Sequence, residues 1–154
     1  MNAAAGANAK PMLIAQLNAL LADCFALYLK TKNFHWHVRG PNFHDLHLLF
    51  DAQATEIFAL TDLIAERVRK NGAATLTSLG AIAARARIAD QDSLALDASA
   101  MVGELRDDNT RLIAALREAK AAATAAGDNA TEGAIDDWTD QAERRVWFLG
   151  AILG

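Results

Sequence analysis

All four histidines of the chain lie within one short segment, residues 35–47. His35 and His47 each lie six residues from Pro41, on the two arms of a predicted turn. Because a helical hairpin folded at that turn brings positions at equal distance from it together, we predict that His35 and His47 face one another. His37 and His44 have no acidic partner at a fixed spacing, and their roles stay open.

Three of the acidic residues that follow His47 on the same predicted helix share its stripe. Asp51 lies four residues after His47, and Glu66 lies four residues after Asp62. At about 100° per residue, these four positions fall within about 100° of one another. Imidazole and carboxylate ligands together suit Fe(II), Zn(II) or Mn(II), and not Cu(I).

The two pairs cannot bind one metal ion within a single helix. Asp51 and Glu66 are roughly 22 Å apart along the axis, whereas metal–ligand bonds are about 2 Å long. Either the pairs form separate sites, or two copies of the helix pack antiparallel about an axis near residues 56–57, so that the His47 end of one meets the Glu66 end of the other. The alternative for the second pair is a set of solvated charges, paired with Arg67, Arg69 or Lys70.

Hydrophobic periodicity and turn residues predict an all-α chain. The predicted long helices run from Pro11 to about Val38, from Phe43 to Lys70, from a cap at Asp92 or Ser93 to Gly127, and from Asn129 onward. Residues 73–92 form a long connection that contains a short helix after Thr77-Ser78. A long second connection suits a crossover along the bundle, so we predict a ferritin-like four-helix bundle. Residues 1–10 are predicted to be a flexible N-terminal tail, and residues 11–154 a single domain.

Composition excludes several classes of protein. With 53% hydrophobic and 22% charged residues, the chain is not disordered. A net charge of −4 argues against a dedicated nucleic-acid binder. A single cysteine, Cys24, excludes an internal disulfide and is expected in the core, as is Trp138. No secretory signal or membrane-spanning run is recognised, so a cytoplasmic protein is expected. Three apolar residues of the last helix are expected to bury a subunit interface: Trp147, Phe148 and Ile152.

One segment carries a family resemblance. The sequence Phe34-His35-Trp36-His37-Val38-Arg39-Gly40-Pro41-Asn42-Phe43, followed by His47, Asp51, Asp62 and Ala65-Glu66-Arg67, resembles the Dps family of mini-ferritins (DNA-binding proteins from starved cells). The resemblance extends across most of the chain, down to Trp147-Phe148.

The resemblance implies a shell and a reaction. Family members form hollow dodecamers with a di-iron ferroxidase site at each twofold interface. By this resemblance, His35, His47 and Asp51 of one subunit bind iron together with Asp62 and Glu66 of its neighbour, and Glu66 bridges two irons. The implied reaction is oxidation of Fe(II) to Fe(III), preferably by hydrogen peroxide, followed by mineral storage that protects DNA. Zinc is expected as a competitor of iron.

Further roles are implied for residues around the site. Trp36 is expected beside it, where it intercepts radicals, and Lys32 matches a lysine of the family near the site. Asp128, Glu132 and Asp136 recur every four residues near the start of the last helix, in a region where the family has acidic pores for iron. The alternative for these acids is a helix cap and a favourable interaction with the helix dipole.

DNA binding is expected to be weak. The first ten residues carry only one basic residue, Lys10, and the C-terminus has no basic extension. Apart from DNA binding, two alternatives to a ferroxidase stay open. One is a non-catalytic shell that compacts DNA or sequesters metal, and the other is a helical bundle that binds zinc.

Overall fold

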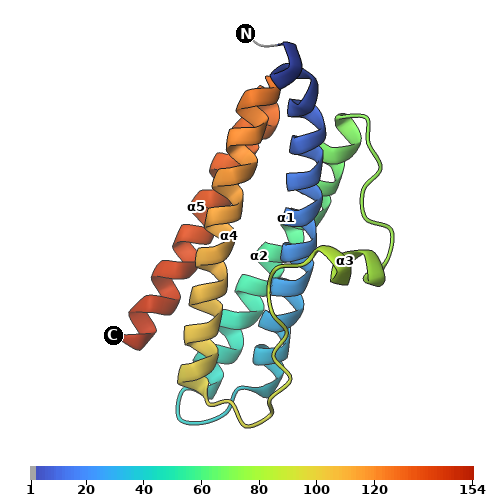
Figure 1. Ribbon diagram of the computed structural model, residues 1–154. Coiled ribbons are helices and arrows are strands. Elements are labelled where there is room, and N and C mark those ends of the chain that lie inside the picture. Colours follow the sequence, from blue (N-terminus) through green and yellow to red (C-terminus); the bar gives the residue numbers. More distant parts are fainter. Residues whose placement is uncertain (1–2) are drawn as a thin grey trace.

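Four long helices and one short helix make up the structure, a computed structural model that describes residues 3–154. In chain order they are α1 (Ala3–His37), α2 (Phe43–Lys70), α3 (Leu79–Arg85), α4 (Ala98–Ala126) and α5 (Asn129–Leu153). Figure 1 shows two antiparallel hairpins, α1–α2 and α4–α5, packed into an elongated bundle, with α3 lying against the outside of α1. The prediction of an all-α, ferritin-like four-helix bundle with a short extra helix is confirmed.

The turn between α1 and α2 lies where the sequence predicts it. Gly40 adopts a positive φ of 109°, which favours glycine, and its carbonyl accepts a hydrogen bond from the Phe43 amide at 3.1 Å. Pro41 follows and prevents α1 from continuing. This turn sets the register between α1 and α2, and therefore decides which side chains of the hairpin meet.

The start of α1 differs from the prediction. The helix begins at Ala3 rather than at Pro11, so residues 3–10 are its first turns and not a loose tail. Alanine has the highest helix propensity, and the alanine-rich segment continues the helix toward the N-terminus. Ala9 is already buried against the bundle. Residues 1–2 of the predicted tail lie outside the described residues.

The long connection crosses the bundle from one end to the other (Figure 1). Within it, Ser78 caps α3 by accepting a hydrogen bond from the Ala81 amide at 3.1 Å. Asp23 of α1 then holds the connection, because its carboxylate accepts hydrogen bonds from the backbone and guanidinium of Arg87 at 2.6–2.9 Å. Lys30, also on α1, donates to the Ala89 carbonyl at 3.0 Å.

The start of α4 was predicted too early. Its N-cap is Asp97, whose carboxylate accepts from the Ala100 amide at 2.8 Å, and neither Asp92 nor Ser93 caps it. Ser93 instead accepts a hydrogen bond from the Ala95 amide in a local turn. Leu94, which the predicted start would place in the first turn of this helix, is exposed in the connection.

The core contains the predicted residues Cys24 and Trp138, and burial raises the pKa of the Cys24 thiol to about 12. Near Cys24 lies a buried charge that the sequence analysis missed. The guanidinium of Arg145, on α5, reaches Glu56 of α2 and Asn109 of α4. The signal was present in the spacing, because Arg145 lies three residues after Ala142 and four before Leu149, which are both buried.

One described helix is long and apolar enough, by length and composition alone, to cross a membrane: residues Ala7–His37. The expectation of no such run is therefore wrong for α1. Core helices of globular proteins pass the same test, and α1 packs against α2, α3 and α4.

Candidate metal centre

His35 and His47 face one another across the hairpin, as the spacing predicts. Their rings stack with centroids 3.9 Å apart and an interplanar angle of 13°. The Nδ1 of His35 contacts the backbone carbonyl of His47 at 2.6 Å, and the Nδ1 of His47 contacts the carbonyl of His35 at 2.7 Å. Because a carbonyl oxygen can only accept, each Nδ1 carries the proton. In the neutral imidazole this tautomer leaves the Nε2 lone pair of each ring for a metal ion.

Asp51 lies beside this pair on α2. Its Oδ1 is 3.9 Å from the Nε2 of His35 and accepts a hydrogen bond from the Nζ of Lys32 at 2.7 Å. The hydrogen bond from Lys32 lowers the pKa of Asp51, which keeps the carboxylate ionised. The Nζ of Lys32 also lies 5.8 Å from the ring centroid of Trp36, whose side chain is exposed. We call Lys32, His35, His47 and Asp51 the histidine half-site.

Asp62 and Glu66 lie further along α2 and are both exposed. Glu66 has one ionic neighbour within 4 Å, Lys70, at 3.8 Å. The structure does not bring these two acids to the histidine half-site of the same chain. Within residues 3–154, no group of three or more His, Cys, Asp or Glu side chains is arranged to hold a metal ion. We call Asp62 and Glu66 the acidic half-site.

The other two histidines lie outside the half-sites. His37 is exposed and its Nδ1 contacts the backbone and side-chain oxygens of Asn33 at 2.9 and 2.7 Å. His44 is exposed near the start of α2. Both histidines are exposed on the single chain, and no role is assigned to them.

The three acids near the start of α5 differ from one another. Asp128 caps α5 and accepts hydrogen bonds from Thr131, Asn71 and the Arg67 guanidinium at 2.5–3.1 Å. Burial opposes the ionisation of Asp128, but these hydrogen bonds outweigh it and hold its pKa well below the usual range. Asp136 pairs with Lys120 at 2.5 Å, and Glu132 is half-buried. Asp128 therefore has a structural role, and pore lining stays a prediction.

The apolar residues near the C-terminus remain at the surface of the single chain. Trp147 is 68% exposed and Ile152 is 44% exposed. The ring of Trp147 lies edge-on to Phe148 with centroids 5.0 Å apart, and Arg144 lies over the Phe148 ring. Their burial between subunits stays a prediction.

Comparisons with known proteins place the chain in a family. The ferritin-like domain family matches residues 14–154. The chain is 36% identical to a DNA protection during starvation protein of Brevibacillus brevis, over 89% of this chain and 91% of that one. Dps from Thermosynechococcus elongatus has a TM-score of 0.94 at 27% identity, covering 97% of this chain and 95% of that structure.

A second similar structure carries the metal chemistry of its superfamily in its description. Dps from Vibrio cholerae, with a TM-score of 0.90 and 27% identity over 96% of this chain and 92% of that one, is described as a member of a broad superfamily of ferritin-like diiron-carboxylate proteins. Binding and oxidation of iron, iron storage and DNA protection are the general functions that this membership supports. The chain thus belongs to the Dps family of ferritin-like proteins.

Proposed function

We propose that the protein oxidises Fe(II) to Fe(III) with hydrogen peroxide, at di-iron sites that two copies share, and stores the product in a hollow dodecamer. The observation that carries the proposal is the reciprocal pairing of His35 and His47. That pairing fixes both tautomers and leaves two Nε2 lone pairs beside Asp51, a ligand set that suits Fe(II).

The acidic half-site completes the ligand set from the second copy. One copy supplies two imidazoles and the Asp51 carboxylate, and its neighbour supplies Asp62 and Glu66. The antiparallel pairing of two α2 helices brings these halves together twice, because a twofold interface repeats every contact. Carboxylate oxygens are hard, anionic ligands and stabilise the ferric product over the ferrous substrate.

The reaction balances with two irons for each peroxide. Two Fe(II) ions each lose one electron, the O–O bond breaks, and two protons are taken up to give two waters. Delivering both electrons together avoids the release of hydroxyl radical. Trp36, one residue from His35, lies where it can intercept a radical that escapes.

Lys32 is proposed to act on the site through Asp51. Its ammonium group pairs with Asp51 at 2.7 Å in the metal-free chain. A metal ion that binds Asp51 must displace this cation, so Lys32 tunes the affinity for iron. Zinc, which accepts the same ligands, is expected to compete with Fe(II).

Cellular roles follow from the same proposal. Iron is proposed to enter the shell past Glu132 and Asp136, in the cytoplasm, and removal of Fe(II) and peroxide protects DNA. Direct DNA binding is expected to be weak at physiological salt, because Lys10 is the only basic residue among the first ten.

The test uses mixed shells. The double variants His47→Ala/Asp51→Ala and Asp62→Ala/Glu66→Ala are each expected to oxidise anaerobically loaded Fe(II) no faster with peroxide than a protein-free control. Unfolding and reassembling them in equal amounts puts one of each in about half of the dimers, and each such dimer has one intact site of two. About a quarter of the wild-type rate should return.

Two results would count against the proposal. Recovery that never rises above the separate variants removes the shared site. A wild-type protein that binds Fe(II) without accelerating its oxidation leaves the non-catalytic shell as the better description. A shell of Gln141→Ala, a variant outside both half-sites, controls for losses during reassembly.

A further inference from the structure

A small polar pocket lies between α2 and α5. It has a volume of about 70 Å³, and its lining includes Gln53 and Glu56 of α2 and Arg144, Arg145 and Phe148 of α5. We call it the arginine pocket. Because a water molecule takes up about 30 Å³ in the liquid, the pocket has room for about two waters or one small oxyanion. No predicted iron ligand lines it, so it is separate from both half-sites.

Two residues of this pocket carry a buried polar atom without a hydrogen-bond partner. Gln53 is 5% exposed and Arg145 is 2% exposed. The Oε1 of Gln53 and the Nη2 of Arg145 accept and donate no hydrogen bond within residues 3–154. Buried polar atoms are nearly always hydrogen-bonded, because an unpaired one loses its bonds to water and gains none in return. Two such atoms on residues of one pocket indicate a ligand with polar atoms of its own.

The guanidinium of Arg145 has one nitrogen left for that ligand. Its Nε donates to the Oδ1 of Asn109 at 2.7 Å, and its Nη1 donates to the carboxylate of Glu56. Arginine has five N–H donors in a rigid planar fork, accepts no hydrogen bond and keeps its charge in proteins. The Nη2 therefore needs an acceptor, and an anionic oxygen is the strongest one.

Arg144 adds a second cation to the pocket. Its side chain is exposed, and its guanidinium carbon lies 4.8 Å from the centroid of the Phe148 ring. Among residues 3–154, no carboxylate forms an ion pair with Arg144. Glu56 is the one acid in the lining of the pocket. Two positive charges against one negative charge favour an anion over a neutral ligand.

Gln53 narrows the class of anion. Its Oε1 is a carbonyl oxygen and can only accept, so a ligand that pairs with it must also donate a proton. Inorganic phosphate near neutral pH has both kinds of group, because its charged oxygens accept hydrogen bonds and its remaining P–O–H donates one. The planar fork of arginine also matches the oxygens of a phosphate.

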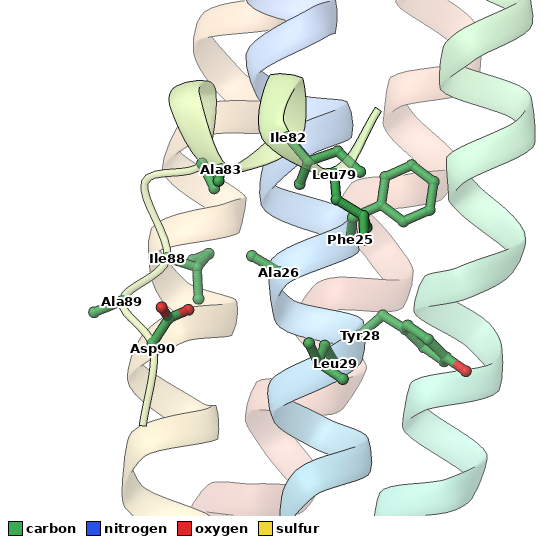
Figure 2. A pocket seen from close by; sticks show the side chains of 11 residues that line it. Phe25, Ala26, Tyr28, Leu29, Leu79, Ile82, Ala83, Ile88, Ala89 and Asp90 are labelled. Carbon is green, nitrogen blue, oxygen red and sulfur yellow. The ribbon is translucent and has the colours of Figure 1, made fainter. Parts of the chain in front are cut away.

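The volume of a hollow does not by itself select this site. A larger hollow of about 650 Å³ lies between α1 and α3, where Leu29 and Leu79 are exposed (Figure 2). The side chains labelled there are apolar apart from Tyr28 and Asp90. That lining offers no cation to an anionic ligand, whereas the arginine pocket offers two.

We propose that the arginine pocket binds a protonated oxyanion of the phosphate class. The charged oxygens of the ligand accept hydrogen bonds from Arg144 and from the Nη2 of Arg145, and its hydroxyl donates to the Oε1 of Gln53. The ligand thereby joins α2 to α5 at the level of the buried Arg145. This site does not depend on the proposed iron chemistry.

Calorimetric titration of inorganic phosphate into the metal-free assembled protein tests the proposal, in a buffer of low ionic strength. Iron is left out because it binds phosphate itself. One saturable site per chain is expected. Arg144→Gln should weaken the affinity about tenfold, as for the loss of one hydrogen bond to a charged group. Arg117→Gln, which changes an exposed arginine of α4 outside the pocket, is the matched control and should bind as wild type does.

A second variant keeps the test independent of folding. Gln53→Glu places a carboxylate where the amide lies, so it gives the Nη2 of Arg145 an acceptor within the chain and repels phosphate. We expect no measurable phosphate binding by Gln53→Glu, with a Tm in phosphate-free buffer at or above that of wild type. Loss of binding in that variant is then not a loss of structure.

Three results would overturn the proposal. Wild-type affinity in Gln53→Glu would mean that phosphate binds away from the pocket. Equal losses in Arg144→Gln and Arg117→Gln would mean that the anion responds only to the net charge of the surface. A wild-type protein without saturable binding would leave water as the occupant of the pocket.

Discussion

The two half-sites lie on the same helix and differ in how far one chain organises them. The histidine half-site is held by two reciprocal hydrogen bonds, a ring stack and the ion pair of Lys32 with Asp51. The acidic half-site consists of two exposed carboxylates, and the one ion pair there joins Glu66 and Lys70 at 3.8 Å. The single chain therefore holds the first half-site in place through its own contacts and leaves the second exposed with few contacts.

This difference suits the two half-sites to different roles in the proposed iron binding. Fixed imidazoles lose little conformational entropy on binding iron, so they favour capture and orientation of the substrate. Mobile carboxylates can adjust as the charge of the metal rises from ferrous to ferric. We infer that order is supplied by the hairpin and adaptability by the partner copy.

The largest expected effect compares one ligand from each half. His47→Ala and Asp62→Ala are each expected to lower the initial rate of peroxide-dependent Fe(II) oxidation by ~100-fold or more, since each removes a proposed iron ligand. Only His47→Ala should also lower Tm, because only His47 makes contacts within its own chain.

Stopped-flow absorbance and calorimetry on the same samples measure both effects. His44→Ala, an exposed histidine of the same helix, should match wild type in both. Equal losses of Tm in His47→Ala and Asp62→Ala would mean that one chain holds both half-sites equally firmly, against the comparison drawn above.

The histidine half-site was predictable from sequence for a local reason. The Gly40-Pro41 turn and the periodic apolar residues on both sides fix the hairpin, so counting from the turn is enough to pair His35 with His47. The bounds of α2 follow from equally local signals, at Phe43 and at Asn71-Gly72. Nothing in one chain tests the acidic half-site, because its proposed partners belong to another copy.

Other features depended on tertiary contacts that no local pattern encodes. Asp92 and Ser93 are good caps by type, but Gln91 just before them is tied to Asn33 of α1 and to Glu104 of α4, and the helix begins only after Asp97. The spacing of Arg145 places it on the buried face of α5, but its partners Glu56 and Asn109 lie on other helices and are seen only in the structure.

Asp128 differs from the two acids of the acidic half-site, because several hydrogen bonds within its own chain hold its carboxylate. Asp128→Ala removes a cap and its hydrogen bonds to Arg67, and should cost about 2 kcal/mol of stability, or roughly 4–8 °C in Tm. The rate at the iron site should stay unchanged.

The sign of its pH dependence follows from the lowered pKa of Asp128. The stabilisation is fully present above the unfolded pKa, about 3.9, and is lost as pH falls toward the lower folded value. The Tm gap between wild type and Asp128→Ala should therefore be constant from pH 7 to about pH 5 and shrink below pH 4. A gap that widens on acidification would contradict this account.

A variant of Lys32 tests whether its ion pair with Asp51 lowers the affinity of the histidine half-site for Fe(II). Lys32→Gln removes a cation that competes with Fe(II) for Asp51, so the apparent affinity for Fe(II) at pH 7 should rise about fivefold, as for one charge interaction of about 1 kcal/mol. The pKa of Asp51 should return toward its usual value, because the hydrogen bond from Lys32 is what lowers it. Anaerobic Fe(II) titration measures the affinity, and weaker binding would mean that Lys32 mainly holds Asp51 in place.

Lys70 gives the smallest expected effect and the closest match to Lys32. Both lysines pair with an acid of the proposed site, but Lys70 lies 3.8 Å from Glu66 and both partners are more than half exposed. Solvent screens such pairs and side-chain entropy opposes them. Lys70→Gln should therefore leave Tm unchanged, and the affinity for Fe(II) should stay within twofold of wild type in the titration used for Lys32→Gln. If the two variants shifted affinity equally, the acidic half-site would be as firmly held as the histidine half-site, and its proposed adaptability would have no basis.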